Sequence, residues 1–383
     1  MKPRAFFPCV ISMLLGVLAV QGQGYYFNLS PLATFGASGG NDGWLSPGEG
    51  GYAYLGTANN ERGLAFGNGH LYLVSHANVG GTTANVRILD PLTGADLGGL
   101  NNSGISGGTF LVNNAAVGSD GVIYVANLTT SSSSSAFKIY SWANEGSAPT
   151  VAYSGTAGIS GVRAGDDLAA FGSGSSTILA AGYNSSPSVA GNNGYAIISR
   201  SANSATAVGF SGTPPNAGDF RLGLTFSDAS HVIGTAGSSL YRYTSFFGAS
   251  GTLLASPSIP DPAGATADRL LAYTVLDGVA LLAVQSVGDS HVSIYDETDP
   301  SNPVWLGSEN NTTGALTANG NGTGELAWGN VTYNADGTVS EDLYAMSSNQ
   351  GIQAFIVTVP EPGSSSLAML GLAILGVRRK ARP

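Results

Sequence analysis

A repeat of about fifty residues constrains the fold of this chain more than any other feature. Six apolar segments recur at this spacing, and each is followed by a second and a third apolar run of strand length. The opening segments of the six units are 63–67, 115–118, 168–172, 222–226, 270–273 and 326–329. A short unit of strands cannot bury its apolar face alone, so repetition predicts sheets that stack on one another.

The first five units continue into a fourth strand-like run, whereas the sixth stops at the C-terminal motif described below. Residues 25–29 or 32–35 have strand composition and could supply the missing strand, which would leave no open sheet edge. The sequence therefore predicts an all-β protein, a β-propeller of six four-stranded blades closed by an N-terminal strand. Because Asn-rich loops blur the repeat boundaries, seven blades or a pair of β-sandwiches remain as alternatives.

The charge distribution excludes some classes of partner. Charged residues make up 10% of the 383 residues, against roughly 25% in an average soluble chain. Six of the 14 basic residues lie in the two terminal segments. The interior of the sequence therefore contains eight basic residues but nearly all of the 24 acidic ones. Nucleic acid is an unfavourable partner for such a surface, since phosphate binding needs clustered Lys and Arg. The single cysteine, Cys9, lies in the N-terminal segment, which leaves the rest of the chain no disulfide or thiolate.

The N-terminus has the organisation of a secretory signal peptide. Lys2 and Arg4 precede an apolar run from about residue 6 to residue 20, and small residues follow it. The run is short for a membrane span, which needs about 20 apolar residues. We expect residues 1–22 to direct export and residues 23–359 to form the propeller domain.

The C-terminus has three elements in a fixed order. Pro360-Glu361-Pro362 is followed by a small linker, an apolar segment at 367–377 and the basic cluster Arg378-Arg379-Lys380. The basic cluster favours the cytoplasmic side of the membrane. As a helix, the apolar segment would span about 16 Å, short of a hydrocarbon core of about 30 Å, so insertion through it would be transient.

These residues closely resemble the PEP-CTERM sorting signal of exported proteins from Gram-negative bacteria that make extracellular polymers. The resemblance covers residues 360–383. It implies recognition by an exosortase-type membrane enzyme, removal of the tail, and delivery to the cell surface or extracellular matrix. A simple C-terminal anchor is the alternative.

Two further resemblances concern the repeats. Residues 292–304, with Asp296, Asp299-Pro300 and Asn302-Pro303, resemble the LVIVD propeller repeat, although Asn302-Pro303 departs from its pattern at the second proline. Across 61–66 and 343–355 the chain looks like an uncharacterised family of secreted bacterial propellers, which implies no activity.

Motifs for catalysis or metal binding are weak. No nucleophile elbow, phosphate-binding loop or dinucleotide fingerprint occurs. The histidines His70, His231 and His291 lie at strand edges, which argues against a three-histidine metal site, and we expect no cofactor. Asp296, Glu297 and Asp299 could bind calcium through clustered oxygens, but turn chemistry explains the same residues.

Charged residues recur immediately before the inner strands of five units, and they include four of the eight interior basic residues. In a propeller these positions converge on one end of the central channel, where they would form a charged funnel for polar ligands such as sugars. A ring of ion pairs between blades is the structural alternative. The candidate ligand-binding residues are Glu61, Arg62, Arg163, Asp166, Asp167, Asp219, Arg221, Asp268, Arg269 and Glu325.

Two classes of function are consistent with these features. The first is a non-catalytic surface or matrix protein that binds extracellular polysaccharide or a surface protein. The second is a hydrolase or lyase acting on glycans, with an acid and a base drawn from the carboxylates of the funnel. The sequence favours the non-catalytic class, because no recognisable nucleophile occurs at the repeat position that the funnel residues occupy.

Overall fold

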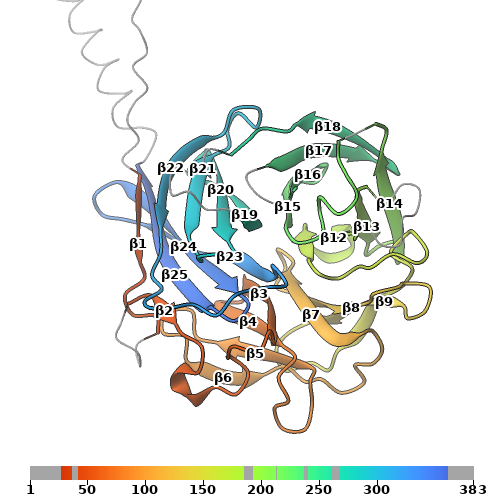
Figure 1. Cartoon of the computed structure of the whole chain (residues 1–383), viewed down its shortest axis with the longest axis horizontal. Coiled ribbons are helices and arrows are strands. Elements are labelled where there is room, and N and C mark those ends of the chain that lie inside the picture. The colour runs from red at the N-terminus through yellow and green to blue at the C-terminus, as the bar shows by residue number, and fades with distance from the viewer. Residues whose placement is uncertain are drawn as a thin grey trace, which may run out of the picture.

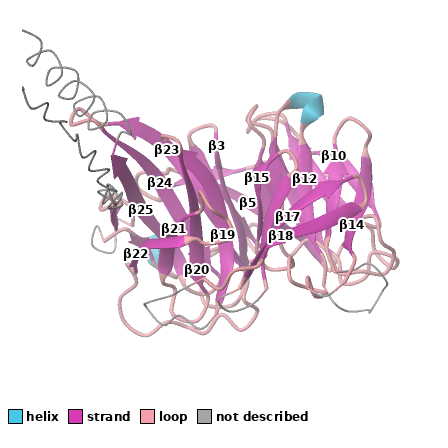
Figure 2. Ribbon diagram, turned by 90° about the horizontal axis from the view of Figure 1, so that it is seen from above, coloured by secondary structure: helices cyan, strands magenta, loops and turns pink. Residues whose placement is uncertain are grey.

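The computed structural model describes residues 27–36, 42–184, 193–212, 214–236, 240–259 and 267–360. Within these ranges the regular secondary structure is β-strand, apart from two short 3₁₀ turns at Glu49–Gly51 and Gly174–Ser176. Figure 1 shows the sheets arranged around a common centre, and Figure 2 shows them standing side by side when the molecule is turned. The arrangement is all-β and propeller-like, as the repeats predict.

The first two sheets each repeat the same antiparallel order, starting at the strand nearest the centre and moving outward. The first contains β3 (Glu61–Gly67), β4 (His70–Ser75), β5 (Asn85–Leu89) and β6 (Asp96–Gly99). The second contains β7 (Phe110–Val117), β8 (Ile123–Leu128), β9 (Phe137–Trp142) and β10 (Thr150–Gly155).

The next two units share one eight-stranded sheet. One half contains β11 (Ala169–Phe171), β12 (Ile178–Gly182), β13 (Tyr195–Ser199) and β14 (Ser204–Phe210). The other contains β15 (Leu224–Asp228), β16 (His231–Thr235), β17 (Tyr241–Phe247) and β18 (Ser250–Ala255). A short parallel pairing of the outer strands β14 and β18 joins the halves. The described chain therefore has five sheets, and the prediction of six separate blades is not confirmed, because two outer strands meet edge to edge.

The last two sheets complete the ring seen in Figure 1. One contains β19 (Asp268–Leu276), β20 (Val279–Ser286), β21 (Val292–Asp296) and β22 (Val304–Glu309). The other contains β23 (Gly324–Tyr333), β24 (Thr338–Ser347), β25 (Gly351–Pro360) and the N-terminal strand β1 (Asn28–Pro31), with β2 (Trp44–Leu45) also on β25. β1 pairs antiparallel with β25, so an N-terminal segment does supply the outer strand of the sixth unit. It overlaps the first of the two predicted segments, 25–29, and ends just before the second, 32–35.

Glycine allows neighbouring inner strands to approach closely around the centre. A Cβ added at Gly63 of β3 would lie 2.6 Å from the Cα of Asn114 on β7. A Cβ added at Gly223, just before β15, would collide with the carbonyl oxygen of Arg269 on β19. These contacts bring together the segments that precede the inner strands, and so they position the charged residues found there.

Candidate functional site

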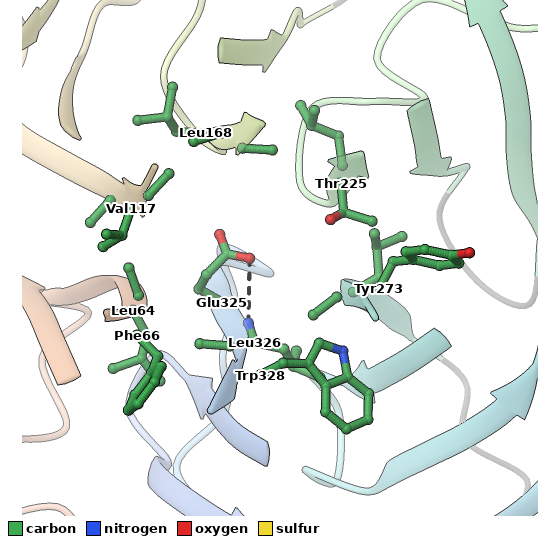
Figure 3. Close-up of a pocket in the computed structure, with 18 residues that line it drawn as sticks. Leu64, Phe66, Val117, Leu168, Thr225, Tyr273, Glu325, Leu326 and Trp328 are labelled. Atoms are coloured by element: carbon green, nitrogen blue, oxygen red, sulfur yellow. Dashed lines mark hydrogen bonds between the residues drawn. The ribbon is translucent and has the colours of Figure 1, made fainter. Parts of the chain in front are cut away.

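The inner strands of all six units line a central channel of about 230 Å³. Most of the residues that line it have apolar side chains, with one leucine from each of five units and larger side chains further along the strands. Figure 3 shows the carboxyl side chain of Glu325 in the middle of this ring of lining residues. The labelled wall residues include Leu64, Phe66, Val117, Leu168, Thr225, Tyr273, Leu326 and Trp328.

Glu325 forms a carboxyl pair with Asp167 across the channel. Glu325 lies on β23, Asp167 lies just before β11, and their side chains hydrogen bond to each other. Asn114 Nδ2 donates to Glu325 Oε2 at 2.8 Å, and the backbone N–H of Leu224 donates to Asp167 Oδ2 at 2.6 Å. The pair therefore connects four units of the ring through one buried polar network.

Burial keeps a proton on this pair. Asp167 is 2% exposed and Glu325 is 7% exposed. Loss of hydration raises the pKa of Asp167 to about 7, and burial together with the neighbouring Asp167 raises the pKa of Glu325 well above its ordinary value. One carboxyl group can then donate to the other, as required when two acids share a site.

Asp166, the neighbour of Asp167, is the centre of a group of arginines. Arg163 binds it with two hydrogen bonds, Nε to Oδ2 at 2.6 Å and Nη2 to Oδ1 at 2.5 Å. Arg221 Nη1 donates to the same Oδ2 at 3.3 Å. This bidentate geometry is the strong form of arginine–carboxylate pairing.

Two more arginines extend the group. The charges of Asp166 and Arg163 act on Arg62, and the charges of Arg163 and Arg269 act on Arg221. Burial is the main cause that lowers the pKa of both Arg62 and Arg221. We call Arg62, Arg163, Arg221 and Arg269 the arginine cluster. Its members precede or begin four different inner strands, so the repeat brings together residues that lie far apart in the sequence.

Three of the predicted carboxylates have more local roles. Glu61 accepts hydrogen bonds from the backbone N–H groups of Gly56 at 2.6 Å and Asn349 at 3.5 Å. Asp219 accepts from the backbone of Asn216 at 2.8 Å and from Arg242 Nε at 3.0 Å. Asp268 is buried at the start of β19. The predicted set therefore divides into the arginine cluster with Asp166, the carboxyl pair, and these three acids.

Sequence reasoning missed two features near the cluster. Arg242 lies on β17, which is not an inner strand. Its position in the repeat therefore gave no sign of its contact with Asp219. A pocket of about 390 Å³ lies beside Arg62. Its lining includes Asn59, Asn60, His76 and Phe110. Asparagine is so common in this chain that its position carried no signal.

The remaining histidines and the calcium candidates have separate partners. His70 contacts Glu145 at 2.6 Å, while His231 and His291 contact nearby aspartates. Asp296 and Asp299 accept turn hydrogen bonds from Thr298 and Ser301, and Glu297 accepts one from the hydroxyl of Tyr241. No group of three metal-binding side chains occurs among the residues that the structure describes.

The predicted signal peptide at 1–22 and the tail beyond Pro360, with Glu361, Pro362, Arg378, Arg379 and Lys380, lie outside the described residues. In the part of the chain that is described, no helix has the length and apolarity to span a membrane.

Family models match two parts of the sequence. Residues 53–219 match a domain of unknown function, DUF4623. Residues 358–382 match the PEP-CTERM protein-sorting motif, which confirms the resemblance of the tail. The motif implies export, sorting to the cell surface in Gram-negative bacteria, and processing by an exosortase-type enzyme. The resemblance to the LVIVD repeat rests on the sequence pattern alone.

Solved structures resemble the fold at low sequence identity, and no curated protein matches the sequence. A DUF4623 family protein from Bacteroides eggerthii is 15% identical, with a TM-score of 0.55 over 79% of this chain and 71% of that one. The Malassezia sympodialis allergen Mala s 1 is 11% identical, with a TM-score of 0.47 over 79% and 92% of the two chains. The Pseudomonas aeruginosa periplasmic gluconolactonase PpgL is 15% identical, with a TM-score of 0.40 over 79% and 88%. At these identities, the likeness to the Bacteroides protein establishes a shared fold and no activity.

Proposed function

We propose that this protein binds an extracellular polymer, most directly a polysaccharide, at the surface or in the extracellular matrix of a Gram-negative bacterium, without catalysing a reaction. The sorting motif supports the location. The arginine cluster supports the binding function, because guanidinium groups from four inner strands gather where those strands begin. Convergent polar groups beside a pocket are the usual form of a ligand site.

The proposed organisation follows the sequence units. Residues 1–22 would act as a signal peptide, 23–359 as the propeller domain and 360–383 as the removable sorting tail with transient membrane insertion. Each half of the eight-stranded sheet has the order of a separate four-stranded sheet. On that basis we count two blades in it, which gives six blades with β1 as the outer strand of the last.

A glycan hydrolase or lyase is the second candidate, and the carboxyl pair is the observation that bears on it. Glycosidases hold their two carboxyl groups about 5 to 9.5 Å apart, so that the scissile bond or a water fits between them. Asp167 and Glu325 instead hydrogen bond to each other and are buried. This geometry favours a structural role for the pair and a non-catalytic role for the protein.

A carbohydrate array with the exported protein, purified from the producing cells, tests the binding function. We expect retention on extracellular polysaccharides, with no release of shorter oligosaccharides on prolonged incubation. Appearance of new reducing ends or unsaturated sugars would favour the enzyme instead. Absence of binding to every polysaccharide of the producing bacterium would contradict the proposal.

Replacement of Pro360-Glu361-Pro362 by alanines tests the sorting tail. Export should continue, because the N-terminal segment is unchanged, but the protein should remain with the membrane since the polar motif that is recognised has been lost. Cell fractionation combined with the mass of the mature C-terminus measures both effects. Replacement of Arg378-Arg379-Lys380 is the matched control, and it should weaken retention instead. Normal maturation of the alanine variant would show that the tail is only an anchor.

A further inference from the structure

We infer that the pocket beside Arg62 binds a uronate unit of an acidic polysaccharide, with the sugar carboxylate on the Arg62 guanidinium and the sugar hydroxyls on the neutral polar side chains of the pocket. This inference rests on the proposed binding function and names the ligand class that the site would select.

Arg62 is a buried cation without a salt bridge in the described part of the chain. It is 5% exposed, its Nη1 donates to Thr323 Oγ1 at 2.8 Å, and its Cζ lies 5.3 Å from the centre of the Phe110 ring. Its Nε has no hydrogen-bond partner among the described residues. By contrast, Arg163 has two hydrogen bonds to Asp166. A buried guanidinium with unused donors is costly unless an anion binds it, and a carboxylate matches its planar geometry.

The pocket offers polar groups that carry no charge. Asn60, Thr83 and Thr109 line it, and the side chains of Asn60 and Thr83 make no hydrogen bond within the described residues. His76 also lines it, and burial followed by the charge of Arg62 lowers its pKa to about 4, which keeps the imidazole neutral. The Nε2 of His76 has no partner in the described structure. Amide, hydroxyl and neutral imidazole groups are suited to hydroxyl groups, which both donate and accept.

The size and position of the pocket suit a single sugar unit of a longer polysaccharide. Its volume of about 390 Å³ falls in the range of roughly 300 to 1,000 Å³ that is common for small-ligand sites. The charge of Arg163, a second member of the arginine cluster, acts on Arg62 and so favours a second carboxylate nearby. A nucleic acid needs a long basic surface, whereas this chain has a formal net charge of −10 and its arginine cluster contains only four arginines.

Binding of defined oligosaccharides to the exported protein tests the inference. The probes are oligomers of galacturonate, glucuronate and mannuronate, together with the methyl ester of each, which keeps the hydroxyls and removes the charge. We expect at least one uronate oligomer to bind, and its methyl ester to bind at least tenfold more weakly, as measured by titration calorimetry. A tenfold loss is the size expected when a charge-assisted hydrogen bond is removed.

Two variants assign the binding to the pocket. Arg62→Gln removes the charge and should weaken binding of the uronate oligomer at least tenfold, while binding of the methyl ester changes little. Asn60→Asp keeps Arg62 and the side-chain shape but adds a repelling carboxylate, so it remains informative if Arg62→Gln folds poorly. Asn144→Asp is the matched control: Asn144 is exposed in the turn between β9 and β10, and an aspartate can still accept from the Gly146 N–H.

The outcomes separate this inference from the broader proposal. Equal binding of uronate and ester, or unchanged binding by both pocket variants, would overturn the uronate site while leaving a polysaccharide-binding function in place. Failure of all three uronates, with retention on a neutral polysaccharide of the array, would overturn it in the same way. Preference for a single-stranded oligonucleotide over every sugar would overturn both the ligand class and the proposed function.

Discussion

Phe35→Ala is expected to lower the free energy of unfolding by about 3 to 5 kcal/mol, the usual cost of removing a buried phenylalanine ring. Phe35 is 0% exposed and belongs to an apolar cluster that joins the last sheet to the first. Its ring centre lies 5.8 Å from that of Tyr344 on β24, and Leu89 of β5 belongs to the same cluster. The substitution would therefore weaken the contact between the two ends of the ring.

Backbone pairing adds to the effect of this segment. Leu32 N donates to the carbonyl of Ala354 on β25 at 2.9 Å, and Gly36 N donates to Thr93 in the β5–β6 turn at 3.2 Å. Deletion of residues 27–36 should accordingly destabilise the protein more than Phe35→Ala does. Phe247→Ala is the matched control, because the side chain of Phe247 is 91% exposed and its loss should change stability by less than about 0.5 kcal/mol. Equal urea midpoints for the two alanine variants would contradict closure through the N-terminal segment.

The protein is expected to be more stable at pH 5 than at pH 8. Burial is the first cause that raises the pKa of Asp167, Glu297 and Glu341, each to about 7, and Glu325 is raised as well. A carboxyl group whose folded pKa exceeds its unfolded value contributes stability that is complete below about pH 4 and is lost as pH rises through about 7. Each such group lowers the free energy of unfolding by about 1.4 kcal/mol per pH unit in that window. Urea unfolding at pH 5, 6, 7 and 8 measures the slope.

Glu325→Gln isolates the part of this slope that comes from the carboxyl pair. Glutamine can accept the hydrogen bond from Asn114 and donate one to Asp167, so the network stays connected while one ionisable group is removed. The slope should become shallower by at least about 1.4 kcal/mol per pH unit. Asp336→Asn is the control, since Asp336 is exposed and the amide can still accept from the backbone of Thr338. A slope equal to that of the unchanged protein would show that the pair ionises normally.

The strands of the fold could be predicted from the sequence because the repeat exposes their period. Runs such as 71–74 and 281–284 lie within β4 and β20, and the N-terminal contribution to the last sheet followed from a missing fourth strand. The parallel contact between β14 and β18 could not be predicted, because it depends on how two outer edges meet in space rather than on any local pattern.

The candidate site could be predicted only as a set of positions. The position before the inner strands singles out Arg62, Arg163, Arg221 and Arg269, and the charges of Arg163 and Arg269 act on other members of this set. The sequence could not predict which partner each acid has. Asp166 and Asp167 are adjacent in sequence, yet Asp166 binds arginine and Asp167 pairs with the carboxyl group of Glu325. Which acid reaches across the channel depends on strand register and on the close approach of backbones at glycines, neither of which is visible in a single sequence.

The crystal structure of the exported protein with the polysaccharide fragment that binds most tightly tests the central claim most directly. The account predicts the fragment at the end of the channel where the inner strands begin, with an anionic group within hydrogen-bonding distance of Arg62. A fragment bound at the opposite end of the channel or on the outer strands, with Arg62 uncontacted, would contradict it.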